Sequence, residues 1–426
     1  MGLRILHLHH RYWPGLGGGE AYLQEFSARL AADGHSVTVA TSDALEPTAH
    51  WDPRAARLPV REAEHRGVRI LRFPLHHLPG SPLSYSLWRY HLFFHLSRWL
   101  PVDASLRLSR YTPWVPDLWR WAATTEERFD LIAGMAVLYE PFVAAGQVLA
   151  KRLGVPHVVY PLTHLGAEAR PGADKVSRYY TMRHQLALVA RADHVITITE
   201  SERSYYIARG IPPARLSVAS PGVEPTEAPD GDAEAFRARH GLTGPIVAFL
   251  ATMLPDKGAI QVVQATARLA ERGVPVTLVM AGNRVPVFET FFARQPDSVR
   301  ANVRVLGVIT EQEKRDLLAA ADVLAMPSRT DSFGIVYLEA WLAGKPVIGA
   351  RAWAMDEVIA DGVDGLLVPF GDAGALTDAL AGLLDDPARR AALGAAGRAK
   401  VLARYTWAHA YARVRAAYQG LVAGVS

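Results

Sequence analysis

The sequence predicts an α/β fold made of two Rossmann-like domains, each built on a mostly parallel β-sheet. Short runs rich in Val, Ile and Leu alternate with helical stretches, which is typical of parallel sheets with both faces covered. This alternation occurs in two series, separated by a polar stretch at 224–242. A chain of 426 residues is long enough for two or three domains with cores of their own.

The first series opens with a strand, a glycine-rich loop and a helix at 18–34 that ends at a glycine. Its expected strands are 4–10, 35–42, 129–135, 156–162 and 194–199. The expected strands of the second series are 245–252, 276–282, 303–307, 323–328, 345–350 and 366–369. Ligands of open parallel sheets bind beyond the carboxyl ends of the strands, so two facing domains would share a cleft.

Composition narrows the class of protein. Half the residues are hydrophobic and 21% are charged, which is ordinary for a globular enzyme. The absence of cysteine excludes disulfides, thiol nucleophiles and cysteine metal sites. A net charge of +4 and the lack of a recognisable module argue against nucleic acid as a partner. The first residues resemble a strand rather than a signal peptide, and no apolar run reaches ~20 residues, so we expect a cytoplasmic location.

A loop and helix at 328–349 carry two carboxylates. The pattern predicts a helix over 333–343, and on a wheel of ~100° per residue Glu339 falls on its apolar face. Glu339 therefore needs a partner, because an unpaired buried charge is costly. At ~1.5 Å of rise per residue, Asp331 and Glu339 lie ~12 Å apart, which is wide for two carboxylates that flank one glycosidic bond.

We therefore expect the two carboxylates to hold opposite ends of one elongated ligand. A sugar would lie near Asp331, a diphosphate at the N–H groups of Phe333–Ile335, and a ribose near Glu339. The alternative is a core helix in which Glu339 makes a structural salt bridge.

Other candidate residues follow strands, where a cleft would lie. Three glycines at 17–19 let a backbone approach a ligand closely, although a tight structural turn would look the same. Lys257 follows a strand of the second series, where its ammonium could neutralise a diphosphate. His164 follows a strand of the first series, but a lone histidine is more often structural. No HExxH pattern occurs, so zinc is not expected.

Residues 82–121 interleave Trp, Tyr and Phe with Arg. Trp88, Leu92, Leu96 and Trp99 form a helical stripe within this segment. The pattern is consistent with peripheral contact with a membrane or a lipid acceptor. A helix packed on the first sheet, with solvated arginines, is the alternative.

These motifs, in this order, resemble the retaining glycosyltransferases of family 4, which have the GT-B fold of two facing Rossmann-like domains with an interdomain cleft. The similarity covers nearly the whole chain. It rests on Gly17–Gly19 with Glu20, the His164 loop, ADHVITITE (192–200), SPGVE (220–224), PDKG with Lys257, AGN (281–283), 305–328, 331–349, GVDGLLVP (362–369) and YTW (405–407).

The resemblance implies a nucleotide-sugar donor, transfer with retention, and no metal or other cofactor. It implies an acceptor-binding domain at 1–222 and a donor-binding domain at 223–407, with a C-terminal helix at about 408–426 that packs onto the first. The acceptor would be a glycan, a lipid-linked molecule or a small molecule, in cell-surface polysaccharide, glycolipid or natural-product synthesis.

The same resemblance assigns roles to single positions. His164, Asp331 and Lys257 would act at the reacting centre, where His164 contacts the sugar and Lys257 the diphosphate. Glu339 would bind the ribose hydroxyls, and the main chain near Ile309 the base. The implied donor-binding set is Gly18, Gly19, Thr252, Lys257, Asn283, Ile309, Asp331, Phe333, Gly334, Ile335 and Glu339.

Three departures from the family pattern bear on activity. Asp331 stands where the family usually has glutamate, and Ala251-Thr252 replaces the usual Gly-Arg, so an arginine partner of Lys257 is missing. The stretch 350–359 lacks the usual glycine pair. Two rival functions therefore stay open: a sugar-nucleotide epimerase or hydrolase, and a non-catalytic nucleotide-sugar-binding protein.

Overall fold

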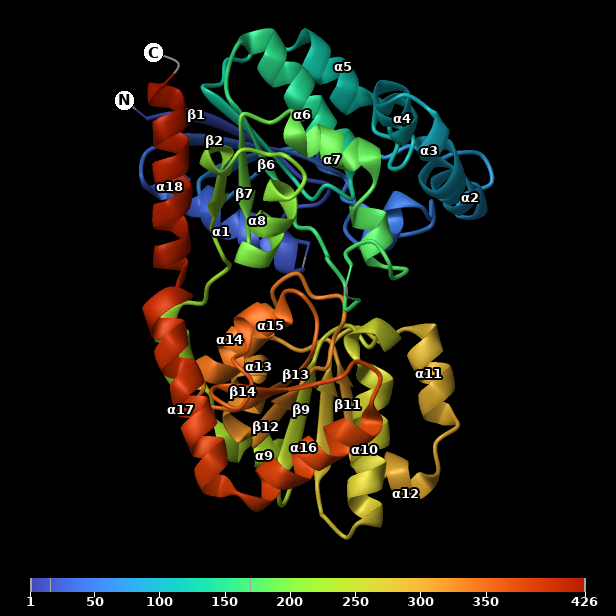
Figure 1. Cartoon of the computed structure of the whole chain (residues 1–426), viewed down its shortest axis with the longest axis vertical. Helices are drawn as coiled ribbons and strands as arrows, with labels where there is room; N and C mark the ends of the chain where they lie inside the picture. The colour runs from blue at the N-terminus through green and yellow to red at the C-terminus, as the bar shows by residue number, and fades with distance from the viewer. Residues whose placement is uncertain (1, 16, 169, 425–426) are drawn as a thin grey trace. The chain divides into compact units, whose positions relative to one another are not determined.

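The computed structural model describes residues 2–15, 17–168 and 170–424 (Figure 1). The chain divides into two compact units. Unit 1 comprises residues 1–164, 171–220 and 410–426, and unit 2 comprises residues 165–170 and 221–409. Across the described ranges, no helix combines the length and the apolar character that crossing a bilayer requires.

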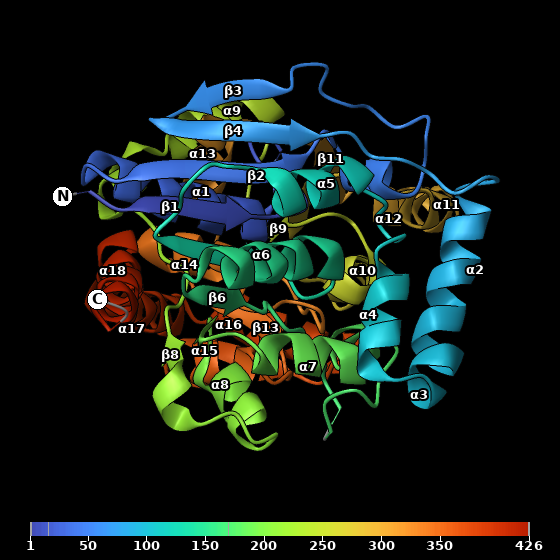
Figure 2. The same cartoon turned by 90° about the horizontal axis from the view of Figure 1, so that it is seen from above.

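Unit 1 is built on an eight-stranded sheet of order β3-β4-β2-β1-β5-β6-β7-β8. Neighbouring strands run parallel, except that β3 and β4 form an antiparallel hairpin. Figure 2 shows β3, β4, β2 and β1 side by side at one edge of this sheet. The strands are β1 (Arg4–Leu8), β2 (Ser36–Ser42), β3 (Glu62–His65), β4 (Val68–Phe73), β5 (Leu131–Met135), β6 (His157–Tyr160), β7 (His194–Thr197) and β8 (Leu216–Val218).

Helices connect these strands. The α-helices of unit 1 are α1 (Gly18–Ala32), α2 (Leu83–His91), α3 (Ser97–Trp99), α4 (Val102–Ser109), α5 (Pro116–Thr124), α6 (Glu140–Leu153), α7 (Arg183–Ala190) and α8 (Glu200–Ile207). Shorter turns are η1 (Pro47–His50), the π-helical η2 (Leu92–Leu96), η3 (Ser177–Tyr180) and η4 (Pro213–Arg215).

The core of unit 1 lies between the sheet and helix α6. Every residue of β5 is buried, as expected for a strand covered on both faces. Ile132 of this strand clusters with Phe142 and Leu149 of α6. A Cβ at Gly134 would lie 2.9 Å from the Cα of Val143, so glycine allows the helix to approach the strand this closely.

Unit 2 is built on a six-stranded parallel sheet of order β11-β10-β9-β12-β13-β14. Its strands are β9 (Ile246–Leu250), β10 (Thr277–Ala281), β11 (Val303–Gly307), β12 (Val323–Ala325), β13 (Val347–Ala350) and β14 (Gly365–Val368). Its helices are α9 (Ala233–His240), α10 (Ala259–Glu271), α11 (Pro286–Ala293), α12 (Asp297–Arg300), α13 (Glu311–Ala320), α14 (Ile335–Leu342), α15 (Met355–Val358), α16 (Ala373–Asp385) and α17 (Pro387–Arg404), with turns η5 (Pro225–Asp230) and η6 (Pro255–Lys257).

Helix α18 (Trp407–Ala423) ends the described chain, and from residue 410 it belongs to unit 1. The Tyr418 hydroxyl lies 2.9 Å from the Tyr160 hydroxyl and 3.0 Å from Nε2 of His7. Tyr411 donates to Asp33 at 2.6 Å. These contacts attach the last helix to β1, β6 and the end of α1.

The expected strands are all present, but the structure adds three that the sequence analysis did not predict. They are the β3–β4 hairpin and β8. The hairpin turns at Arg66 and Gly67, with φ of 52° and 75°, as a two-residue hairpin turn requires. Because this edge of the sheet is partly exposed, β3 and β4 contain charged residues. They therefore lack the continuous apolar runs from which the other strands were predicted.

Candidate functional site

The strand order of unit 2 reverses at β9, which pairs with β10 on one side and β12 on the other. Ligands of open α/β sheets bind beyond the carboxyl ends of the strands at such a point. Two loops leave the sheet here, one at 251–258 after β9 and the other at 326–334 after β12. The fold therefore brings together the loops that carry Lys257 and Asp331.

An ion pair joins these two loops. Nζ of Lys257 donates to Oδ1 of Asp331 at 2.6 Å, and about a fifth or less of each side chain is exposed. A Cβ at Gly258, whose φ is 83°, would lie 2.6 Å from the carbonyl oxygen of Pro327. Glycine at 258 therefore allows the loops after β9 and β12 to approach each other closely. This approach holds the ammonium and the carboxylate together at the carboxyl ends of the strands.

A second ion pair lies beside the first. Nε of Arg329 donates to Oδ1 of Asp256 at 2.9 Å, and the guanidinium lies 4.7 Å from the centroid of the Phe370 ring. Arg329 N–H also donates to the Asp256 carbonyl at 3.0 Å. Neither Asp256 nor Arg329 was predicted as a site residue, although each lies within two residues of one that was.

Helix α14 begins later than the sequence predicted. It starts at Ile335 rather than Phe333, because Gly334 has a φ of 82° and cannot belong to a right-handed helix. A Cβ on Gly334 would also lie 2.5 Å from the Tyr337 ring. Phe333 precedes the helix with its ring buried edge-on against Tyr405. Among the three proposed phosphate contacts, Ile335 alone is helical, and its N–H belongs to the first turn, which lacks intrahelical partners.

Glu339 lies in α14 and is paired with Lys314 of α13. Nζ of Lys314 donates to Oε1 of Glu339 at 2.7 Å and lies equally close to Oε2 of Glu311. The partner that a carboxylate on an apolar face requires is therefore present. Glu339, Lys314 and Glu311 line a small cavity of about 40 Å³.

The pKa values of this pair follow from burial and from mutual attraction. Burial raises the pKa of the Glu339 carboxyl, and the ammonium of Lys314 partly offsets this effect. Burial lowers the pKa of Lys314, but Glu339 and Glu311 outweigh it, so the pKa of Lys314 is raised overall. The lysine is therefore a fixed cation that favours the ionised form of Glu339.

The remaining predicted residues of unit 2 also follow strands. Thr252 and Asn283 come after β9 and β10, and N–H of Met253 donates to the Asn283 carbonyl at 2.8 Å. Ile309 lies between β11 and α13, two residues before Glu311. Ile309 is thus near in sequence to the Glu311–Lys314–Glu339 group, which places the predicted base contact beside the predicted ribose contact.

In unit 1 the sheet order reverses at β1, which pairs with β2 and β5. Gly18 and Gly19 are the first two residues of α1, after the loop that follows β1. Arg11 donates to Glu20 at 2.7 Å, and both side chains are almost fully buried. A Cβ at Gly17 would collide with this carboxylate, so the buried pair fixes the glycine loop.

His164 follows β6, so it lies at the same carboxyl ends of the strands as the glycine loop. Its ring lies 4.5 Å from that of Tyr180, measured between centroids. A Cβ at Gly19 would lie 3.4 Å from Cδ1 of Leu162, so the start of α1 meets the loop after β6. Leu162 has a φ of 52°, and Ala136, which follows β5, has a φ of 67°. Left-handed non-glycine residues cost energy and cluster at functional sites, which supports a site at the carboxyl ends of these strands.

A histidine cluster at the end of β1 was not predicted. The ring of His10 stacks on Tyr139 with 3.5 Å between centroids, and Nδ1 of His9 lies 2.5 Å from the Arg11 carbonyl. Burial lowers the pKa of both histidines, so both rings are neutral at pH 7. The paired letters HH were visible in the sequence, but nothing there indicated that both rings would be buried.

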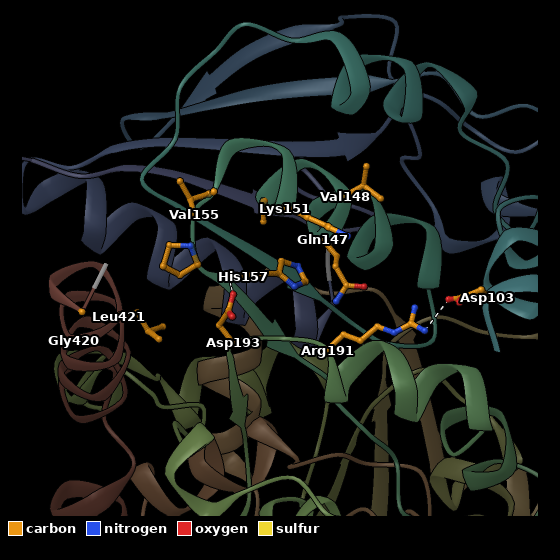
Figure 3. Close-up of a pocket in the computed structure, with 14 residues that line it drawn as sticks. Asp103, Gln147, Val148, Lys151, Val155, His157, Arg191, Asp193, Gly420 and Leu421 are labelled. Carbon is orange, nitrogen blue, oxygen red and sulfur yellow. Dashed lines mark hydrogen bonds and ion pairs between the residues drawn. The ribbon is translucent and has the colours of Figure 1, made fainter. Parts of the chain in front are cut away.

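A cavity of about 970 Å³ lies at the opposite end of the unit 1 strands (Figure 3). It is lined by Lys151 and Gln147 of α6, by Arg191 and by the start of β6 at His157. Arg191 pairs with Asp103 at 2.7 Å across this cavity. Because it lies at the amino ends of the strands, we assign it to neither substrate.

Lys314 is the most consequential residue that the sequence analysis missed. The carboxylate on the apolar face of α14 signalled that a cation must exist. The cation lies 25 residues upstream on another helix, so helical spacing could not identify it.

Comparisons with known proteins identify the family to which the chain belongs. The family described as "Glycosyl transferase 4-like domain" matches residues 17–222, and "Glycosyl transferases group 1" matches residues 232–400. D-inositol 3-phosphate glycosyltransferase of Stackebrandtia nassauensis is 30% identical over 92% of this chain and 84% of its own length.

Two GDP-mannose-dependent mannosyltransferases match a shorter segment. The enzyme of Corynebacterium glutamicum, named for monoacylated alpha-(1-6)-phosphatidylinositol monomannoside, is 37% identical over 43% of this chain and 49% of its own length. The alpha-(1-6)-phosphatidylinositol monomannoside mannosyltransferase of Mycolicibacterium smegmatis is 36% identical over 51% and 59%. The matched segment thus spans between about half and three fifths of these relatives.

Solved structures show the same fold. Sucrose-phosphate synthase from Thermosynechococcus elongatus has a TM-score of 0.74 at 22% identity, covering 99% of this chain and 100% of the other. Anabaena HepE in complex with UDP and glucose has a TM-score of 0.70 at 18% identity, covering 98% and 100%.

Two Rossmann-like parallel sheets, each with its loops gathered at a point of strand reversal, define a protein of the GT-B class. Within that class, the chain belongs to glycosyltransferase family 4.

Proposed function

We propose that this protein transfers a hexosyl or related sugar, with retention, from a nucleotide-sugar donor to an acceptor hydroxyl. The observation that carries the proposal is the Lys257–Asp331 ion pair at the reversal point of the unit 2 sheet. The loop that carries Asp331 leads into α14. The first turn of this helix offers N–H groups, and its fifth residue is Glu339. Asp331, the start of α14 and Glu339 thus follow one another along a single segment, and Lys257 joins them from the loop after β9.

The departing diphosphate carries the largest charge that develops in the reaction. We propose that Lys257 neutralises this charge. Its ammonium lies in the loop after β9, and its flexible side chain can leave Asp331 to bind a phosphate oxygen instead. The N–H groups at the start of α14 add the positive end of the helix dipole. In this proposal, Lys257 and the helix start offset the charge, and no metal or cofactor is assigned.

Asp331 then has two roles in sequence. It holds Lys257 before the donor binds, at 2.6 Å. Once the ammonium of Lys257 has bound a phosphate oxygen, the carboxylate of Asp331 can accept hydrogen bonds from hydroxyls of the donor sugar. We propose that His164 contacts the sugar from unit 1, and that the acceptor proton passes to a phosphate oxygen on the face that the leaving group vacates.

Glu339 is proposed to accept hydrogen bonds from the ribose hydroxyls. An ionised carboxylate offers two acceptor oxygens to a pair of neighbouring hydroxyls, and Lys314 favours the ionised form. The cavity beside this pair holds only about 40 Å³, so the nucleoside would lie mainly outside it. Ile309 and Asn283 are proposed to contact the donor from the neighbouring loops.

For the acceptor we propose a lipid-linked glycan intermediate, used at the inner face of a membrane in cell-surface glycan or glycolipid synthesis. Support comes from two relatives, both of which are named as mannosyltransferases of a phosphatidylinositol monomannoside. A soluble acceptor is the competing choice, since another relative is named for inositol 3-phosphate.

The test is a transfer assay on the full chain with radiolabelled GDP-mannose, UDP-glucose and UDP-galactose, each offered with lipid extract and with inositol 3-phosphate. We expect label in one acceptor class, release of the nucleoside diphosphate, and an NMR signal showing the anomeric configuration of the donor in the product. Free sugar released faster than transfer would favour a hydrolase instead. Tight donor binding without turnover would favour a non-catalytic binding protein, consistent with Thr252 in place of arginine.

A further inference from the structure

One face of the helical stretch 83–99 in unit 1 exposes large apolar side chains. Helix α2, the π-helical turn η2 and helix α3 follow one another without a break, and in both Figure 1 and Figure 2 they lie beside α4, away from the strands. At the end of this stretch, Trp99 is 87% exposed. We call the exposed side the apolar face; it consists of Leu83, Leu87, Tyr90, Leu96 and Trp99.

The opposite side of the same stretch is anchored in the protein. Leu92 and Phe93 are buried, and indole Nε1 of Trp88 donates to the Leu108 carbonyl at 3.3 Å. Arg89 points inward and donates to the Thr112 carbonyl at 2.6 Å. The apolar face therefore belongs to an ordered helix whose other side already has its partners.

The structure also narrows the region expected from the sequence. Within 100–121, Val115 and Leu118 are completely buried in the unit 1 core. The predicted stripe of Trp88, Leu92, Leu96 and Trp99 divides: the first two face inward, and the last two belong to the apolar face. An external partner would thus meet residues 83–99 rather than the whole of 82–121.

The charged residues within the stretch 83–99 are all basic. The sequence contains no Asp or Glu from 65 to 102. Arg98 lies within the stretch, Arg178 stacks over the Phe94 ring at 5.5 Å, and Arg183 donates to the Arg98 carbonyl at 3.0 Å. All three arginines are exposed, and among the described residues none forms an ion pair with a carboxylate.

From these observations we infer that residues 83–99 dock on the surface of an anionic lipid bilayer. A helix with an apolar face, interfacial Trp and Tyr, and flanking arginines lies in the plane of the headgroups, where its apolar side chains enter the acyl boundary. The arginines complement the negative potential of anionic lipids. The inference rests on the proposed function in one respect: a lipid-linked acceptor would explain why the protein docks on a membrane. The evidence for docking itself is the exposed apolar face and the arginines around it.

The experiment is flotation of the full-length protein with vesicles, in the absence of any nucleotide sugar. We use phosphatidylcholine alone and phosphatidylcholine with 30% phosphatidylglycerol, a composition chosen as ~0.3 anionic fraction to resemble a charged membrane surface. We expect binding to the anionic vesicles that weakens as salt rises, because surface charges are screened. Because no donor is present, failure here is distinct from failure of the transferase proposal.

Two variants probe the two contributions. The double variant Leu87→Ser/Trp99→Ser should weaken binding by roughly tenfold or more, because both side chains would leave the acyl boundary. Arg98→Gln should weaken it about five-fold, the contribution of one arginine near an anionic surface. Matched controls are Val363→Ser and Arg272→Gln, which change exposed residues of unit 2 and should bind as the wild type does.

Three results would overturn the inference. The first is absence of binding to either vesicle type, and the second is binding of Leu87→Ser/Trp99→Ser at wild-type strength. The third is a dimer in light scattering that the same double variant converts to a monomer without any vesicle binding, which would make a second copy of the chain the partner. Unchanged circular dichroism and melting of the double variant exclude misfolding as the cause of a loss.

Discussion

Replacing Lys314 with methionine should reveal how strongly Glu339 depends on its partner. The change keeps the length of the side chain but removes the ammonium that lies 2.7 Å from Oε1 of Glu339. Hydrogen bonds to charged groups contribute ~1.5–3 kcal/mol, and the side chains of this pair keep 22% and 24% exposure. Because water screens part of the interaction, we expect a loss of about 2 kcal/mol, or roughly 4–8 °C in melting temperature for a unit of this size.

The loss should depend on pH. Burial already raises the pKa of Glu339, and removing Lys314 removes a cause that lowers it. A carboxyl whose pKa is higher in the folded state binds protons more readily when folded, so stability falls as pH rises from its unfolded value through its folded value. The loss caused by Lys314→Met should therefore be larger at pH 8 than at pH 5.

The assay is thermal and urea unfolding of the unliganded protein at both pH values. The double variant Lys314→Met/Glu339→Gln should recover part of the loss, because no buried charge is left without a partner. The control is Arg272→Met, which breaks an exposed pair with the same 2.7 Å separation and should cost less than about 0.5 kcal/mol. If Lys314→Met cost no more than this control, or if its effect did not change with pH, Glu339 would not depend on Lys314 as a partly buried partner, and the account of this pair would be wrong.

Three further predictions concern the donor loops. Lys257→Ala should lower turnover at least tenfold while the fold is retained, measured by release of nucleoside diphosphate; a smaller loss would remove Lys257 from leaving-group stabilisation. Gly334→Ala should abolish donor binding in calorimetry because its Cβ would meet the Tyr337 ring, whereas Gly344→Ala, with open space around it, should keep binding and lose only about 1 kcal/mol of stability. Thr252→Arg should tighten nucleoside diphosphate binding about five-fold or more by adding a second cation, and unchanged affinity would mean that the site does not need one.

The parallel sheets could be predicted because their strands are buried on both faces and so appear as apolar runs. Strand β5, with every residue buried, is the plainest case. The β3–β4 hairpin was missed because it lies at a sheet edge, where charged and apolar residues share one strand. The start of α14 was placed two residues early, because the backbone conformation of Gly334 is not encoded by helical periodicity.

The candidate site was predictable as a set of positions but not as a set of contacts. Lys257 was identified by its place after a strand, Asp331 by its place before the helix that carries Glu339, and both by the resemblance to the family. That they touch depends on the pairing of β9 with β12, which brings together residues 74 apart in the sequence. Lys314 and Arg329 were missed for the same reason: each is defined by a partner on another element.

The measurement that tests the central claim most directly is a calorimetric screen of UDP, GDP, ADP and their common sugar conjugates, on the wild type and on Glu339→Ala. We predict that one nucleotide binds the wild type, that its sugar conjugate binds at least as well, and that Glu339→Ala loses most of the affinity. If no nucleotide bound, or if Glu339→Ala bound as the wild type does, the donor site proposed for unit 2 would be wrong.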